Sequence, residues 1–283
     1  MNTPVDDARR SEPVEDDDWV PLPARPAATV MLVRDIDADG IEVFLMRRHR
    51  AMEFVGGVVV FPGGGVDDRD RSADIDWHGP PPSWWAQRLG VDEDLALALV
   101  CAAARETFEE SGVLLAGTSA TSVVADTTGD DWEADRVALE SRDLSMTDFL
   151  TRRGLVLRSD LLGVWDAWLT PVFEPKRYRT WFFVALLPEG QVTRDVSTES
   201  SEVTWMPARL AAEQADAGEL ALMPPTYLTS MEVGEHASPE EVLAVAASRS
   251  VEMFCPSIEP LGDGWTLSMP DRLRPLVAER RRA

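Results

Sequence analysis

The stretch RETFEESGV, residues 105–113, places three glutamates and one arginine near the end of a predicted helix. The helix signals begin at Asp92, a good N-cap residue, and end at Ser111, where Gly112 follows as a left-handed C-terminal cap. Residues three or four positions apart share one face of a helix. The three acidic side chains are therefore predicted to project together: Glu106, Glu109 and Glu110.

Three carboxylates on one surface repel one another unless a cation separates them. Arg105 lies one turn before Glu109 and can pair with it. Hard oxygen donors at this spacing suit Mg²⁺ or Mn²⁺, and the alternative is a solvated acidic stripe with one internal ion pair. The same face continues toward the N-terminus into Leu95, Leu99 and Ala102, which predicts cover on that side and favours the metal site.

A glycine turn, FPGGG at residues 61–65, is the second half of the predicted site. Phe61 ends a short buried strand, Pro62 fixes the turn, and the three glycines allow the backbone to approach a ligand closely. Together with REUxEExGU, where U is apolar, this turn resembles the signature of Nudix hydrolases. Those enzymes cleave a nucleoside diphosphate linked to another group. Residues 105–113 match at every charged and glycine position, with Thr107 at an apolar one.

The resemblance implies a fold and a set of site residues. The fold is a mixed α/β Nudix-type α/β/α sandwich with a mixed sheet. Mg²⁺ or Mn²⁺ is the implied cofactor, and the implied metal ligands are Glu106, Glu109, Glu110 and the Gly64 carbonyl. Arg105 would orient the carboxylates. The general base would be Glu109 or an acid from the stretch STESSEVTW, which offers Glu199 and Glu202; an exposed loop acid is the alternative for these two.

One departure from the signature concerns its spacing. Gly64 and Arg105 lie 41 positions apart, because a long interruption divides the motif. The first glutamate of the signature is also missing. Counting forward from the glycine reaches Asp70, whereas counting back from the arginine reaches Leu97, and the sequence leaves both open.

An enlarged motif of this kind resembles the coenzyme A diphosphatase-like branch of the family. The stretches VFLMRRHRAMEF, TPVFEPKRYRTWFF and LMPPTYLTSM carry this resemblance, which extends over residues 27–270. It implies hydrolysis of coenzyme A or acyl-coenzyme A to 3′,5′-ADP and phosphopantetheine or its acylated form. Two alternatives stand beside it. One is a Nudix hydrolase of ADP-ribose, dinucleotides or nucleoside triphosphates, and the other is a catalytically silent ligand-binding regulator.

A substrate with several phosphates needs cationic side chains near the site. Two basic clusters are candidates, and solvated strand ends are the alternative for each arginine. The predicted substrate-binding residues are Arg47, Arg48, Arg50, Arg177 and Arg179.

Composition limits the partners and the compartment. The 283 residues carry a formal charge of −23, with 50 acids against 27 bases, which argues against binding to nucleic acid or anionic membranes. A small-molecule nucleotide-diphosphate substrate is therefore the predicted partner, with a homodimer as one option for the oligomeric state. Cys101 and Cys255 fit reduced, buried thiols, and the absence of a signal-peptide pattern predicts a cytoplasmic protein.

The chain divides into three predicted parts. Residues 1–25 form a disordered acidic tail, residues 26–207 form the Nudix domain, and residues 208–283 form a mostly helical extension packed on that domain. Within the domain we expect a β-hairpin around IDADG, a central strand at RTWFFVALLP and a shorter one at EVTWM. Residues 67–91 are an irregular insertion whose tryptophans, Trp77, Trp84 and Trp85, either line an acyl or adenine pocket or form the insertion's own small core, and we favour the core. Residues 125–155 are a helical insertion.

Overall fold

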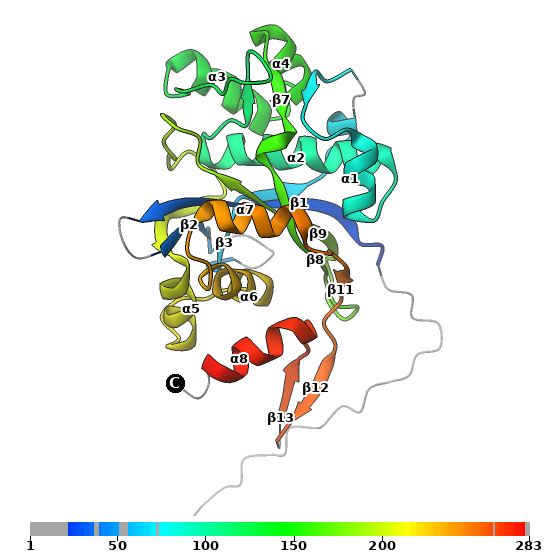
Figure 1. The fold of residues 1–283 in the computed structure, drawn as a ribbon, viewed down its shortest axis with the longest axis vertical. Helices are drawn as coiled ribbons and strands as arrows, with labels where there is room; N and C mark the ends of the chain where they lie inside the picture. Colours follow the sequence, from blue (N-terminus) through cyan, green and yellow to red (C-terminus); the bar gives the residue numbers. More distant parts are fainter. Residues whose placement is uncertain (1–21, 37–39, 51–55, 72–73, 263, 281–283) are drawn as a thin grey trace, which may run out of the picture.

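The computed structural model describes residues 22–36, 40–50, 56–71, 74–262 and 264–280. Within these ranges a mixed sheet of eight strands lies at the centre of the molecule (Figure 1). The strands are β1 (Arg25–Ile36), β2 (Gly40–Arg48), β3 (Val59–Val60), β4 (Gly63–Gly65), β8 (Gly163–Leu169), β9 (Tyr178–Leu186), β10 (Ser200–Pro207) and β11 (Met253–Phe254). Their order is β10-β2-β1-β9-β8-β11, with β3 paired to β2 and β4 paired to β1.

The register of the sheet places the glycine turn beside its central strands. β1 and β2 pair as the predicted hairpin from Val33↔Val43 to Ile36↔Gly40, and the expected turn at 37–39 lies outside the described residues. β3 pairs with the end of β2, and β4 pairs with the start of β1, where Gly64 lies opposite Ala28. β1 also pairs with β9 in parallel along most of its length, so β1 lies between β9 and the strand β4 that carries the glycines.

One face of the sheet is covered by α2 (Glu93–Ser111), the helix that carries the three glutamates. Beside α2 and on its side away from the sheet lies a second group of elements, most of them from the two insertions (Figure 1). It contains α1 (Pro82–Leu89), α3 (Asp130–Glu140), α4 (Met146–Arg153) and a small sheet of β5 (Trp77–His78), β6 (Ala116–Gly117) and β7 (Val156–Arg158). α2 is therefore buried on both sides, which is why its sequence is apolar around nearly its whole circumference.

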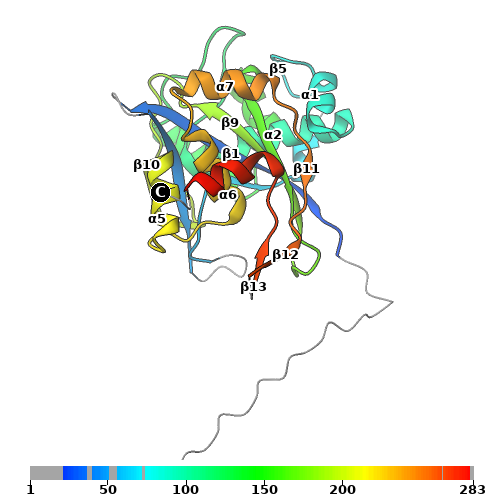
Figure 2. The same cartoon turned by 60° about the horizontal axis from the view of Figure 1, so that its bottom comes forward.

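The opposite face of the sheet is covered by elements that follow β10 (Figures 1 and 2). They are α5 (Ala208–Asp216), α6 (Pro224–Val233), α7 (Pro239–Ser248) and α8 (Arg274–Arg280). The hairpin of β12 (Ile258–Leu261) and β13 (Gly264–Leu267) extends away from the sheet, with Ile258 and Trp265 exposed. The three layers confirm the predicted α/β/α sandwich. In the part of the chain described, no helix combines the length and apolar character needed to cross a membrane.

Several expectations about the outer segments need correction. Residues 67–91 are not simply irregular, because they contain a 3₁₀ turn (Asp68–Arg71), β5 and α1. Trp85 is fully buried in the main core against Phe183, with ring centroids 5.9 Å apart, so it does not belong to a separate small core. The C-terminal extension adds three strands to its helices, and β11 joins the main sheet. Cys101 is buried as expected, whereas Cys255 is exposed.

Candidate active site

The ends of α2 are fixed where the sequence predicted them. The Asp92 carboxylate accepts a hydrogen bond from the Leu95 amide at 2.8 Å. At the other end Gly112 adopts φ 75°, and its amide donates to the Phe108 carbonyl. The helix thus presents its last turn to the glycine turn of the sheet, and the glutamates of that turn are at most 9% exposed.

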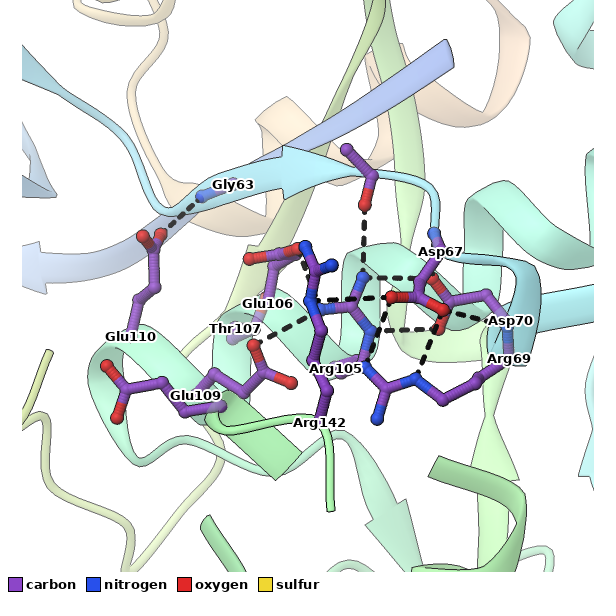
Figure 3. Close-up of polar contacts among 12 residues, drawn as sticks. Gly63, Asp67, Arg69, Asp70, Arg105, Glu106, Thr107, Glu109, Glu110 and Arg142 are labelled. Carbon is purple, nitrogen blue, oxygen red and sulfur yellow. Dashed lines mark hydrogen bonds and ion pairs between the residues drawn. The ribbon is translucent and has the colours of Figure 1, made fainter. Parts of the chain in front are cut away.

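The glycine turn lies directly against these glutamates (Figure 3). The Gly63 amide donates to Glu110 Oε2 at 2.6 Å. A Cβ atom at Gly64 would lie 2.5 Å from Glu106 Oε1, closer than van der Waals contact allows. Glycine is therefore required at position 64 for the backbone and the carboxylate to approach each other as they do.

Arg105 lies between the carboxylates and is 5% exposed. Its Nη1 donates to Glu106 Oε1 at 2.7 Å and to Glu109 Oε2 at 3.1 Å. Its Nη2 donates to the Gly65 carbonyl at 3.1 Å. The arginine thus joins the helix to the glycine turn, as its predicted orienting role requires.

The structure decides between the two candidates for the missing first acid. Asp70 is 1% exposed and accepts two hydrogen bonds from Arg105, Nε to Oδ1 at 2.8 Å and Nη2 to Oδ2 at 2.9 Å. Leu97 packs against the apolar core instead. The motif therefore continues in its usual register from Gly64 to Asp70, and the interruption lies between Asp70 and the arginine.

A second set of residues around Asp70 was not predicted. The Asp67 amide donates to Asp70 Oδ2 at 2.8 Å, and the Asp67 carboxylate accepts from Arg69 Nε at 3.1 Å (Figure 3). The hydrogen bond from Arg69 lowers the pKa of Asp67 to about 2. No sequence signal marks these residues, because their roles depend on the position of Arg105.

Buried negative charge exceeds buried positive charge in this cluster. Three carboxylates contact the one guanidinium, and a fourth, that of Glu110, lies near Glu106 and accepts from the Gly63 amide. Desolvation raises the pKa of each of the three glutamates. The pKa of Glu106 rises to about 7 by burial, although Arg105 opposes the shift. Burial and the neighbouring Glu106 raise the pKa of Glu110 well above its usual value.

The donor set fits a divalent cation. Glu109 Oε1 is buried without a hydrogen-bond partner among the described residues. Carboxylate oxygens with excess negative charge are the ligands that Mg²⁺ and Mn²⁺ prefer. Within those residues, no three His, Cys, Asp or Glu side chains already converge on one point, because Arg105 and the Gly63 amide hold oxygens of Glu106, Glu109 and Glu110.

The two loop acids lie on different faces of the sheet. Glu199 Oε2 accepts from Arg48 Nη2 at 3.2 Å, and both side chains affect the pKa of Glu110, with Glu199 raising it and Arg48 lowering it. Glu202 instead pairs with Arg47 at 3.1 Å and its side chain is 64% exposed.

Strand alternation explains this separation. Phe44 and Met46 of β2 enter the core beside α2, whereas Val43 and Leu45 enter the opposite core. Arg48 continues the first series and Arg47 the second, so Arg47 and its partner face away from the glutamates. Of the two predicted loop acids, the structure therefore brings Glu199 to the site and leaves Glu202 outside it.

The remaining predicted arginines are spread along the sheet. Arg50 is exposed beyond β2. Arg177 donates to the carbonyls of Thr170 at 3.1 Å and Leu22 at 3.0 Å, so it supports the β8–β9 connection. Arg179 lies over the Trp181 ring at 5.7 Å, on the face that α2 covers.

Comparison with known proteins agrees with this geometry. Residues 85–232 match the family described as the NUDT19 Nudix domain. This chain belongs to the Nudix hydrolase family. The crystal structure of a Nudix hydrolase from Alicyclobacillus acidocaldarius superposes with a TM-score of 0.69 and 26% sequence identity, covering 81% of this chain and 98% of that one.

Three animal proteins are similar to this chain. The acyl-coenzyme A diphosphatase NUDT19 of Homo sapiens is 28% identical over 87% of this chain and 76% of its own length. The Xenopus laevis protein of the same name is 24% identical over 81% of this chain and 70% of its own length. A Caenorhabditis elegans protein named as a nudix hydrolase is 27% identical over 65% of this chain, and the match spans about half (52%) of that relative.

Proposed function

We propose that this Nudix hydrolase is a divalent-metal-dependent diphosphatase that acts on coenzyme A or acyl-coenzyme A. The observation that carries the hydrolytic part is a cluster of four buried carboxylates, three of them bonded to Arg105, pressed against a glycine turn in which Gly63 and Gly64 leave no space for a side chain. Such a concentration of buried charge costs folding stability unless a ligand compensates it, so it indicates a site rather than a structural ion pair.

The proposed metal ligands are Glu106, Glu109, Glu110 and the Gly64 carbonyl. A bound Mg²⁺ or Mn²⁺ would neutralise charge on the diphosphate and lower the pKa of the attacking water. Arg105 keeps two of these carboxylates oriented through its bonds at 2.7 and 3.1 Å.

The proton from the attacking water goes to a carboxylate of the chain. Glu109 is the proposed general base because its Oε1 is buried and has no hydrogen-bond partner among the described residues. Glu199 is the alternative, since the structure places it near Glu110. Glu202 was proposed for the same role from sequence, but it pairs with Arg47 on the face of the sheet turned away from the glutamates, so the geometry favours Glu199 over it.

The choice of substrate rests on the animal relatives and on the arginines beside the site. Two relatives are named acyl-coenzyme A diphosphatases, and the match covers most of this chain. Arg48 has a buried Nε without a partner in the described part of the structure, and it faces the glutamates. Arg48 and Arg179 are thus the proposed contacts for the phosphates of coenzyme A, whose hydrolysis would yield 3′,5′-ADP and phosphopantetheine.

The test is incubation of the purified protein with coenzyme A, acyl-coenzyme A, ADP-ribose, a dinucleoside polyphosphate and a nucleoside triphosphate. Each is supplied with Mg²⁺ or Mn²⁺, and the products are identified by mass. We expect 3′,5′-ADP from the first two substrates. Preferential release of AMP from ADP-ribose would overturn the coenzyme A assignment. Nucleotide binding by calorimetry without turnover would overturn hydrolysis.

The variants Glu109→Gln and Glu110→Gln test the residues. Each removes a charged metal ligand but keeps the shape of the side chain, so we expect kcat to fall by about 100-fold or more with little change in Tm. Glu93→Gln is the matched control, because Glu93 lies exposed in the first turn of the same helix. Rates near wild type in both site variants would remove the case for the metal site.

A further inference from the structure

The C-terminal end of α2 is held by side chains from the helical insertion. Arg136 of α3 is 3% exposed, and its Nη1 donates to the Glu109 carbonyl at 2.7 Å. The Thr127 hydroxyl donates to the Gly112 carbonyl at 2.6 Å. Carbonyls of a last helical turn have no partner within the helix, so these contacts fix the turn that carries Glu109 and Glu110.

The same arginine is joined to the loop that precedes β10. Arg136 Nη1 also donates to Glu140 Oε2 at 2.9 Å. The other oxygen of that carboxylate, Oε1, accepts from the Thr198 amide at 2.9 Å and from the Thr198 hydroxyl at 2.6 Å. Thr198 directly precedes Glu199, whose Oε2 accepts from Arg48 Nη2 at 3.2 Å on the face of the sheet that α2 covers.

A second connection runs parallel to the first. Glu133 accepts from Arg136 Nη2 at 2.7 Å through Oε1 and from Arg194 Nη1 at 2.6 Å through Oε2. The Arg194 amide donates to the Ser111 carbonyl at 2.9 Å. A Cβ atom at Gly112 would lie 2.8 Å from Arg194 Nε, so the glycine also leaves room for this arginine across the helix end.

We propose that α3 sets the position of the Glu199 loop relative to the carboxylates of α2, with Arg136, Glu140 and Thr198 as positioning residues. This inference rests on the proposed hydrolytic function. Glu109 lies on α2, whereas Glu199 lies in the loop before β10, so side-chain contacts must set their relative position. The Glu140 carboxylate provides such a contact, because it accepts from Arg136 through one oxygen and from Thr198 through the other. A shift of about 1 Å between such groups can change a rate up to about 100-fold.

The alternative is that these ion pairs merely stabilise the fold. Asp135 provides a matched comparison, because it lies on the same helix and is 9% exposed. It pairs with Arg152 and with Arg153 (Nε to Oδ2, 2.5 Å), both on α4, and thus ties α3 to α4 without reaching the loop. Loss of that pair lowers stability but leaves the connection to Thr198 in place.

The experiment uses four variants of the full chain. Glu140→Gln replaces one acceptor oxygen by an amide donor, and Thr198→Val removes the hydroxyl contact. Thr198→Ser restores that contact, and Asp135→Asn is the stability control. For each variant kcat and KM are measured with coenzyme A and saturating Mn²⁺, Tm is measured, and hydrogen exchange is followed at the Thr198 amide.

We expect Glu140→Gln and Thr198→Val to lower kcat by about 10-fold with KM changed less than about twofold, because the loop acid is displaced and not removed. Exchange at the Thr198 amide should accelerate most in Glu140→Gln. Thr198→Ser should retain a kcat within about twofold of wild type, and Asp135→Asn should lower Tm while keeping kcat.

Two results would overturn the positioning role. One is that Asp135→Asn and Glu140→Gln lower Tm by the same amount and also lower kcat by the same factor. The other is unchanged kcat and unchanged exchange in Glu140→Gln. If the wild-type chain hydrolyses none of the substrates, the proposed function fails, and exchange at Thr198 still decides whether Glu140 holds the loop.

Discussion

The guanidinium of Arg105 binds Asp70, Glu106, Glu109 and the Gly65 carbonyl at the same time. Its five N–H groups lie in one plane, so these partners fix both its position and its rotation. Asp70 contacts the guanidinium through both carboxylate oxygens. Its short side chain reaches Arg105 because the 3₁₀ turn at Asp68–Arg71 brings the Asp70 backbone close to α2.

Asp70→Asn removes one acceptor and the charge opposite Arg105. We expect a loss of about 3 kcal/mol in the free energy of unfolding, since the arginine stays buried with a weaker partner. Denaturant unfolding at neutral pH measures it. Asp68→Asn is the control, because the Asp68 side chain is fully exposed and its change should stay within about 0.5 kcal/mol. Equal effects in the two variants would contradict the pairing.

Glu106 makes the stability of the metal-free protein depend on pH. Burial raises its pKa from 4.5 to about 7, so between these values the folded chain keeps a proton that the unfolded chain has released. The unfolding free energy should therefore fall as pH rises from 4.5 to 7, by about 3 kcal/mol for this group. Denaturation in EDTA at pH 5 and pH 7.5 tests this, with Glu106→Gln as the variant that lacks the titration. Parallel pH profiles for the two proteins would refute it.

Local spacing was enough to predict some site residues and not others. Helical periodicity placed Glu106, Glu109 and Glu110 together, because it depends on the helix alone. Asp70 could be preferred to Leu97 as the first acid of the motif only once the fold of the chain between these two residues was known. The face of the sheet on which Glu202 lies depends on the register shift between Ser200 and Glu202, and no pattern in the sequence indicates that shift.

At the scale of elements, α2 was predictable because both of its caps use local chemistry. α1 was missed, since three consecutive prolines suggested an irregular segment. In the structure Pro82 occupies the first turn of α1, where its missing N–H has no cost, and Gly90 ends the helix with φ 67°. The strands β11 to β13 were missed because they are at most four residues long.

Trp85→Ala tests how α1 is attached to the core. Trp85 is fully buried, whereas Trp84 is half-buried and meets it edge-on at 4.9 Å. We expect Trp85→Ala to cost about 3–5 kcal/mol and Trp84→Ala clearly less, as measured by denaturant unfolding. If these tryptophans instead served a ligand pocket, both variants would raise KM with little change in stability.

At the scale of the whole molecule, the C-terminal segment is tied back to the sheet by a buried ionic network. Asp166 of β8 is 4% exposed and accepts from Arg272 at 2.6 Å and from Trp168 Nε1 at 3.0 Å. Glu232 of α6 accepts from Arg249 at 3.0 Å. These contacts tie the extension to the sheet, and its own strand β11 forms one edge of the sheet.

Arg272→Ala should destabilise the protein by about 2 kcal/mol, because Asp166 stays buried and loses its cationic partner. Arg274→Ala is the matched control: Arg274 pairs with Glu259 and Asp271 near the surface, and its loss should lower stability clearly less than the loss of Arg272. Thermal unfolding of both variants distinguishes the two sites. A larger effect at Arg274 would show that the buried network does not hold the extension.

The contacts that assemble the site join residues far apart along the polypeptide. Arg105 meets Asp70 across 35 positions, and Gly63 meets Glu110 across 47. Both depend on closing long loops, which is slower than forming a helix from neighbouring residues. During synthesis on the ribosome, a nascent polypeptide that ends soon after α2 already contains all four acids. β9 pairs with β1, the strand that holds the glycine turn, and it is synthesised well after α2. We therefore expect the proposed active site to become stable only late in synthesis, when β9 has joined the sheet.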